Sequence, residues 1–293
     1  MMSDAAEGAA NASAMSDAQR RSWALLMRAA EPPSLALAHL VAEIGVVAAA
    51  EAVVARQVPR GHDAALLATR ARLDDRARAR KILDEAARDL DRAERIGARL
   101  ITPEDDEWPG CSLLSTTQGD TSDRGGAPLA LWARGPLRVD DIAAASIAMV
   151  GSRACSSYGS NVTTTISEDL VSQGWGITSG AAVGIDGVAH RAALASDGST
   201  MAVLACGIDR PYPAIHARLL YDIAERGVLL SEYPFGVSVG RHRFLGRNRL
   251  IAALSHAVVV AEAGGRSGAI ATAGWAVKYG RPLGVLPTDV VNG

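Results

Sequence analysis

Four arginines, an aromatic ring and an amide side chain fall within one short segment of the chain: Arg241, Arg243, Phe244, Arg247, Asn248 and Arg249. A guanidinium group matches the charge and geometry of a phosphate group, and an aromatic ring offers a face on which a base can stack. This combination predicts contact with a sugar–phosphate backbone. A solvated basic loop is the commoner explanation of a charge run, but this segment follows an expected strand and leads into an apolar helix at 250–254.

A second candidate motif consists of Gly151, Ser152 and Arg153, which follow an expected strand at 147–150. Glycine lets the backbone approach a ligand closely, the serine hydroxyl can donate a hydrogen bond, and the arginine offers a fork that matches phosphate. A strand-to-helix turn with a surface arginine explains three such residues equally well, so this motif is weak when it stands alone.

Small residues also open two of the expected helices. Ser179, Gly180 and Gly184 precede one of them, and Ser267 and Gly268 precede another. The first N–H groups of a helix lack partners within it and lie at its positive end, which attracts anions. Both turns are therefore predicted to bind phosphate. The chain has no G-x-x-x-x-G-K-[ST] motif and no G-x-G-x-x-G after its first core strand, so P-loop hydrolysis and ordinary dinucleotide binding are not expected.

Asp186 and His190 lie four residues apart, on one face of an expected helix. Asp186 is interpreted as a helix cap, and a contact with His190 is expected to be structural, because no nucleophile lies at a recognisable spacing. The three cysteines, Cys111, Cys155 and Cys206, lack the C-x-x-C spacing, which argues against a disulfide framework or a zinc site. No catalytic residue, metal or cofactor is assigned, and the reducing cytoplasm is the expected location.

Short apolar runs alternate with helical patterns in the second half of the chain. Strands are expected at 147–150, 176–178, 201–206, 228–231, 258–261 and 283–286, with helices near 159–173, 186–196, 214–226, 245–254 and 268–279. Such alternation predicts an α/β fold with a parallel sheet that is covered on both faces. Ligands of these sheets bind at the carboxyl ends of the strands, so the motifs above are expected to converge there.

Composition and patterning divide the chain into regions. It has 293 residues, 48% of them hydrophobic, and a formal net charge of -2, which argues against a wholly basic nucleic-acid coat. Residues 1–20 are expected to be disordered, 21–100 to form a small helical domain, and 101–145 to form a linker and the first elements of a core at 146–293. No apolar run reaches the length of a membrane span, and no secretory signal is visible.

Taken in order along the chain, these motifs resemble those of the DNA-processing protein A (DprA/Smf) family. Any one of them is unspecific, whereas all of them in sequence are highly specific. The matching segments are Gly151 to Arg153, Ser179 to Asp186 with His190, Gly207 to Pro213, Ser231 to Pro234, Phe244 with Arg247 to Arg249, and Glu262 with Ser267, Gly268 and Thr272.

The resemblance implies an extended Rossmann-like fold preceded by a helical, SAM-like domain. It also implies a homodimer that binds single-stranded DNA without catalysis, protects incoming DNA and helps to load RecA recombinase in natural transformation. DNA contact is carried over from the family to Arg153, Ser179, Gly180, Arg247, Asn248 and Arg249. The family's last core strand runs on into a further loop, whereas this sequence stops at Gly293, so the core is expected to be incomplete at its C-terminus.

Two other functions stay open. Nucleotide phosphoribohydrolases of the same broad superfamily carry a P-G-G-x-G-T-x-x-E signature, with a carboxylate on the helix after the glycine turn. Here that helix carries Ala271, Thr272 and Ala273 and no acid at this position, which disfavours glycosidic cleavage. The third function is a nucleotide-sensing module without DNA, because a phosphate cradle does not reveal the length of its ligand.

Overall fold

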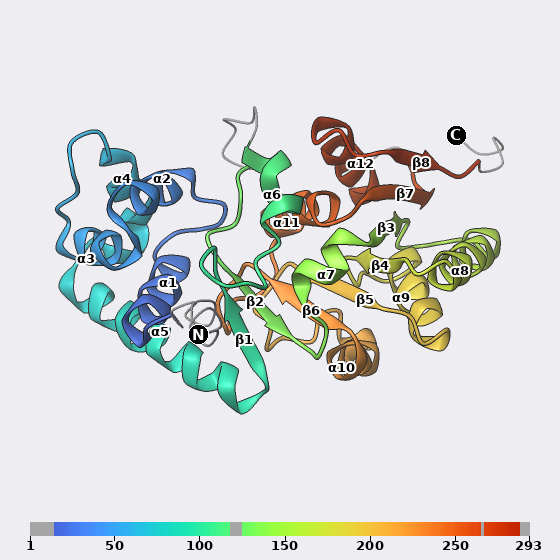
Figure 1. Cartoon of the computed structure of the whole chain (residues 1–293), viewed down its shortest axis with the longest axis horizontal. Helices are drawn as coiled ribbons and strands as arrows, with labels where there is room; N and C mark the ends of the chain where they lie inside the picture. The colour runs from blue at the N-terminus through green and yellow to red at the C-terminus, as the bar shows by residue number, and fades with distance from the viewer. Residues whose placement is uncertain (1–14, 118–124, 265–266, 288–293) are drawn as a thin grey trace, which may run out of the picture.

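The computed structural model describes residues 15–117, 125–264 and 267–287. Within these ranges, eight strands form one sheet in the order β1-β2-β6-β5-β4-β3-β7-β8 (Figure 1). β3 to β8 are parallel, and β1 and β2 add an antiparallel edge. The predicted α/β fold class is confirmed. The strands are β1 Ala98–Ile101, β2 Leu131–Arg134, β3 Ser146–Gly151, β4 Gly176–Ser179, β5 Thr200–Leu204, β6 Val228–Ser231, β7 Ala257–Glu262 and β8 Leu283–Val285.

Helices cover both faces of this sheet (Figure 1). Alternate residues of a strand point to opposite faces, so each strand feeds two cores. Ala148 and Val150 of β3 pack on the side of α7, α11 and α12, whereas Met149 packs on the side of α8 and α9. One face carries α8 Ser157–Ser172, α9 Ile185–Ala195 and α10 Ala217–Arg226, and the other carries α6 Gly110–Thr117, α7 Val139–Ala144, α11 Arg241–Ala253 and α12 Gly268–Lys278.

The observed core elements agree with the expected ones to within a few residues, with two informative differences. α11 begins at Arg241, so the basic segment expected to enter its helix near residue 245 is helical from its first arginine. Arginine is a good helix former, which permits this earlier start. β1 begins at Ala98, inside the region expected to be helical, because its backbone pairs with β2 from Ala98 to Ile101.

Among the described residues, five helices precede the sheet, and we call them the helical unit. They are α1 Asp17–Ala29, α2 Leu35–Ile44, α3 Val46–Ala55, α4 Asp63–Leu73 and α5 Arg76–Arg95. The prediction of disorder up to residue 20 is wrong for its last residues, because Ser16 and Gln19 form a capping box that starts α1. The rest of that prediction, residues 1–14, lies outside the described residues.

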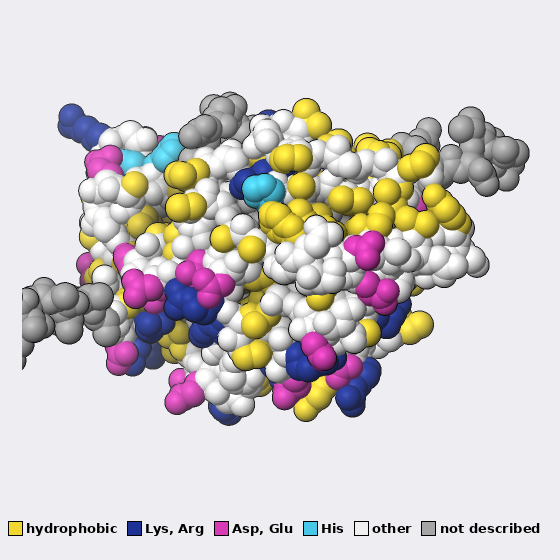
Figure 2. All heavy atoms as spheres, turned by 45° about the vertical axis from the view of Figure 1, so that its right-hand side comes forward, with side chains coloured by type: hydrophobic (Ala, Val, Ile, Leu, Met, Phe, Trp, Pro, Cys, Tyr) yellow, Lys and Arg dark blue, Asp and Glu magenta, His cyan; other side chains and the backbone are white. Residues whose placement is uncertain are grey.

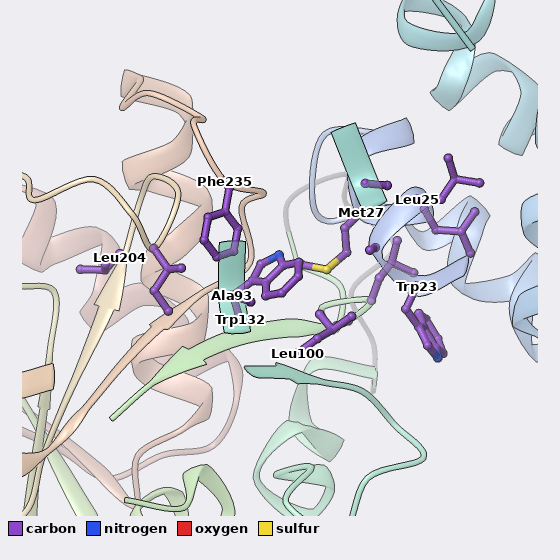
Figure 3. Close-up of a cluster of buried hydrophobic side chains, with 14 of the residues drawn as sticks. Trp23, Leu25, Met27, Ala93, Leu100, Trp132, Leu204 and Phe235 are labelled. Atoms are coloured by element: carbon purple, nitrogen blue, oxygen red, sulfur yellow. The ribbon is translucent and has the colours of Figure 1, made fainter. Parts of the chain in front are cut away.

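The helical unit shares one core with the sheet. Trp132 of β2 is fully buried and meets the ring of Phe235 edge-on, with centroids 5.0 Å apart. Figure 3 shows Met27 of α1 on the other side of the indole, with Leu100 of β1 close by. This shared core fixes the helical unit against one end of the sheet.

Over the described residues, no single helix is both long and apolar enough to cross a membrane. α2 and α3 reach the required length only together, and they are bent by 119° where they join.

Candidate nucleic-acid interface

A hollow of about 840 Å³ opens at the carboxyl ends of β3 and β7. The strand order reverses here, because the chain runs from β3 to β4, β5 and β6 on one side while β7 lies on the other. Open α/β sheets bind their ligands at such a switch point. The hollow brings together nine of the predicted site residues: Gly151, Ser152, Arg153, Arg241, Phe244, Arg247, Asn248, Ser267 and Gly268.

Two arginines at the hollow carry free charges. Arg153, after β3, and Arg241, at the start of α11, are both exposed, and neither forms an ion pair or hydrogen bond with any residue that the structure describes. The guanidinium of Arg153 lies 5.3 Å from the centre of the Phe244 ring. Guanidinium groups with unused donors are suited to phosphate oxygens.

An aromatic surface adjoins these cations. The rings of Phe244 and Tyr212 lie with their centroids 5.7 Å apart and their planes at 49°, and Tyr212 is 42% exposed. Both rings and Arg153 also line a smaller neighbouring hollow of about 50 Å³. Ring faces beside free cations form the combination that holds unpaired bases and their phosphates. The ring of Tyr212 packs against Phe244 and is also accessible from outside.

The turn after β4 does not offer the donors that the sequence predicted. The N–H groups of Gly180 and Ala182 donate to Oδ2 of Asp186, at 3.2 and 3.3 Å, and the Ser179 hydroxyl donates to the carbonyl of Met149 at 2.6 Å. Burial raises the pKa of Asp186, while Arg247 and these hydrogen bonds act in the opposite direction. The Asp186 carboxylate therefore takes the place expected for a phosphate. Ser179 and Gly180 have no donor left for a phosphate in this arrangement, contrary to the prediction.

Gly184 joins this turn to the loop after β3. Its φ of 87° lies in the region that favours glycine, and a Cβ there would sit 2.1 Å from the carbonyl oxygen of Ser152. The same carbonyl accepts a hydrogen bond from the N–H of Ile185 at 3.1 Å. Gly184 thus serves close packing between two loops and does not line the larger hollow.

Arg247 and Asn248 line the hollow but are already engaged. Arg247 is 5% exposed, and its guanidinium donates to the carbonyls of Gly180, at 2.9 Å, and Val203. Burial lowers the pKa of Arg247, although the neighbouring Asp186 opposes this change. Asn248 donates through Nδ2 to the carbonyl of Gly268 at 3.1 Å. These two side chains hold the loops that form the walls of the hollow.

The first turn of α12 completes the wall. Gly268 is exposed there, and the buried Oγ of Ser267 has no hydrogen-bond partner among the described residues. Glu262, at the end of β7, accepts hydrogen bonds from the N–H and hydroxyl of Ser156, at 2.9 and 3.0 Å. The loops after β3 and β7 are therefore tied together behind the hollow. In the described part of the chain, no group of three or more His, Cys, Asp or Glu side chains could hold a metal ion.

The model of the DNA recombination-mediator protein A family matches residues 99–292. The chain belongs to this family. It is 47% identical over 280 residues to a DprA-named protein of Mycobacterium tuberculosis, covering 95% of this chain and 69% of that one. It is 36% identical to DNA processing protein DprA of Streptococcus pneumoniae over 70% of this chain and 72% of that one.

Solved structures of DNA processing protein A share the architecture. The Streptococcus pneumoniae protein matches with a TM-score of 0.67 at 25% identity, over 94% of this chain and 86% of that one. The protein from Helicobacter pylori matches with a TM-score of 0.57 at 27% identity, over 67% of this chain and 83% of that one. That structure is described for its single-stranded DNA binding mode.

In this DprA-family chain, two of the predicted arginines lie away from the hollow. Arg249 is fully buried and pairs with Glu232, so the expectation that it contacts DNA directly is corrected. Arg243 points from α11 to Glu31 of the helical unit, with Nε 2.6 Å from Oε1. The partner of Arg243, Glu31, lies 212 positions earlier in the sequence, so the sequence pattern does not reveal this pair.

Proposed function

We propose that the hollow binds the backbone and bases of single-stranded DNA. The observation that carries the proposal is a pair of exposed arginines, Arg153 and Arg241, that form no ion pair or hydrogen bond with the described residues. They lie beside the accessible ring of Phe244 at the switch point of the sheet. Phosphates would meet the guanidinium groups and an unpaired base would meet the ring. The single-stranded DNA binding described for the Helicobacter pylori relative supports this proposal.

We propose that the chain binds DNA without catalysing a reaction. Glu262 is the carboxylate nearest in sequence to the glycine turn, and its Oε2 is engaged with Ser156 behind the hollow. A phosphoribohydrolase would need an acid directed at the sugar. Release of free base from a nucleoside monophosphate would favour that alternative.

The family relationship supports a role as a recombination mediator, and we propose that the protein acts in the cytoplasm. We propose that the bound strand is protected and handed to RecA recombinase, as in natural transformation. We further propose a homodimer formed through β8, the last strand of the described sheet, where Leu283 and Val285 are exposed, together with Val277 of α12. Figure 2 shows hydrophobic side chains gathered over the upper part of the face that includes this end of the molecule.

A length series tests the proposed ligand. Thymidine oligonucleotides of increasing length and thymidine monophosphate are titrated against the protein by fluorescence anisotropy or competition. Affinity that rises with length and falls with salt is expected, because each added phosphate contact releases counterions. Equal affinity for the monophosphate and the longest strand would instead favour a nucleotide-sensing module.

A further inference from the structure

Glu31 connects the helical unit to the helix that lines the hollow. It follows α1, and its carboxylate accepts hydrogen bonds from Arg243 of α11, with Nε at 2.6 Å and Nη2 at 3.2 Å. His242 Nε2 lies 3.1 Å from Oε1, and Arg72 of α4 donates to Oε2. One carboxylate thus holds side chains from two parts of the fold.

The segment that leads into α11 is held at a second point. Arg28 of α1 donates to the carbonyl of Phe235 at 2.9 Å, and the same guanidinium is fixed by Asp89 of α5, at 2.6 and 2.7 Å. The ring of Phe235 packs against Trp132. The helical unit therefore forms hydrogen bonds with both ends of the segment from Phe235 to Arg243.

The first turn of α11 needs a negative charge from outside. It contains Arg241, His242 and Arg243 and no acid, and its N-cap, Gly240, makes no side-chain capping bond. Cations at the positive end of a helix are unfavourable, and a carboxylate placed there is stabilising. Glu31 supplies that carboxylate from the helical unit.

The charges around Glu31 are consistent with a strong interaction. Burial acts to raise its pKa, but hydrogen bonds and charges from Arg243 and Arg72, with His242, outweigh burial and hold the pKa below its ordinary value. The hydrogen bond to Glu31 raises the pKa of Arg243. Glu31 is accordingly ionised at neutral pH.

We infer that Glu31 is a positioning residue for the hollow, which fixes the first turn of α11 and with it Arg241 and Phe244. Arg243 lies between those two residues in sequence and points to Glu31, while they line the hollow. The inference rests on the proposed function for its effect on DNA, but the order of α11 can be measured without DNA. The helical unit thereby becomes part of the binding machinery.

A double-mutant cycle tests this role. Glu31→Gln and Arg243→Gln are each expected to weaken binding of a thymidine oligonucleotide by about three- to tenfold. The double variant is expected to lose less than the product of the two single effects, since the two residues share a contact. The control, Glu43→Gln, removes the surface pair with His62 in the same helical unit and is expected to leave affinity unchanged. Additive effects, or wild-type affinity in Glu31→Gln, would overturn the inference.

Hydrogen exchange in the absence of DNA keeps the outcome distinct from the proposed function. The amides of 240–246 are expected to exchange faster in Glu31→Gln than in the wild type, while those of β3 to β5 do not change. Unaltered exchange in 240–246 would contradict the positioning role, whether or not the protein binds DNA. If exchange changes but no strand binds to the wild type, the proposed function fails and the positioning of α11 stands.

Discussion

The carboxylate of Glu232 and the guanidinium of Arg249 form a two-pronged ion pair inside the protein, with N–O distances of 2.5 and 2.8 Å. The exposed fractions of the two side chains are 2% and 0%. Arg249 also donates to the carbonyls of Gly126 and Gly246, at 2.8 and 3.1 Å. Every nitrogen of this guanidinium therefore has a partner, and the pair joins the end of β6 to α11.

Arg249→Ala is expected to lower the free energy of unfolding by about 3 to 5 kcal/mol, because it leaves the Glu232 carboxylate buried without a partner. Urea unfolding followed by circular dichroism measures the change. Arg241→Ala, which removes an exposed arginine from the same helix, is expected to stay within about 0.5 kcal/mol of the wild type. Equal stabilities for the two variants would contradict the structural role of Arg249.

Phe244→Ala is expected to weaken single-stranded DNA binding by about 1 to 3 kcal/mol through the loss of stacking. The salt dependence of binding should not change, because no phosphate contact is removed. Titrations at several salt concentrations separate the two effects. A reduced salt slope, with affinity lost mainly at low salt and little at high salt, would show that the ring acts only by orienting Arg153.

Burial lowers the pKa of His190 to about 3. In the unfolded chain the imidazole gains its proton near pH 6.5, whereas in the folded protein it stays neutral until about pH 3. The unfolded state binds more protons in this window, so stability falls as the pH falls from 6.5 towards 3, by up to about 1.4 kcal/mol per pH unit.

His190→Gln is expected to reduce this loss of stability between pH 6.5 and 5, where most carboxylates stay ionised. The imidazole Nδ1 lies 2.7 Å from the Thr200 hydroxyl, not on Asp186 as the sequence suggested, so the variant is also expected to be less stable at neutral pH. The exposed His39 provides the control, since His39→Gln should retain the wild-type slope. Parallel stability curves for His190→Gln and the wild type would refute this account.

Sequence predicted the fold well because the signals for it are local. Apolar runs such as 147–150 and 228–231 become β3 and β6, and the loops that follow these two strands place Arg153 and Arg241 at the carboxyl ends of the sheet. The convergence of these arginines follows from parallel topology alone.

The sequence does not predict which arginines are exposed at the hollow and which are buried in hydrogen bonds. Arg241, Arg247 and Arg249 share one residue type and one helix. Arg241 is exposed and forms no ion pair or hydrogen bond with a described residue, whereas Arg247 and Arg249 are buried and hydrogen-bonded. Their difference depends on the direction of each side chain from α11 and on partners elsewhere in the chain, such as Glu232. Asp186 likewise takes the donors of Gly180 and Ala182, a competition that spacing does not reveal.

The salt dependence of single-stranded DNA affinity in Arg153→Ala with Arg241→Ala tests the central claim most directly. The matched control, Arg60→Ala with Arg76→Ala, removes two exposed arginines of the helical unit and should behave as the wild type. If the hollow binds the strand, the Arg153→Ala, Arg241→Ala variant is expected to bind about 10- to 100-fold more weakly. The slope of log K against log salt is expected to fall in magnitude by about 1.4, since each lost phosphate contact contributes about 0.7. Wild-type affinity and wild-type salt slope in the Arg153→Ala, Arg241→Ala double variant would contradict the proposal that the hollow binds single-stranded DNA.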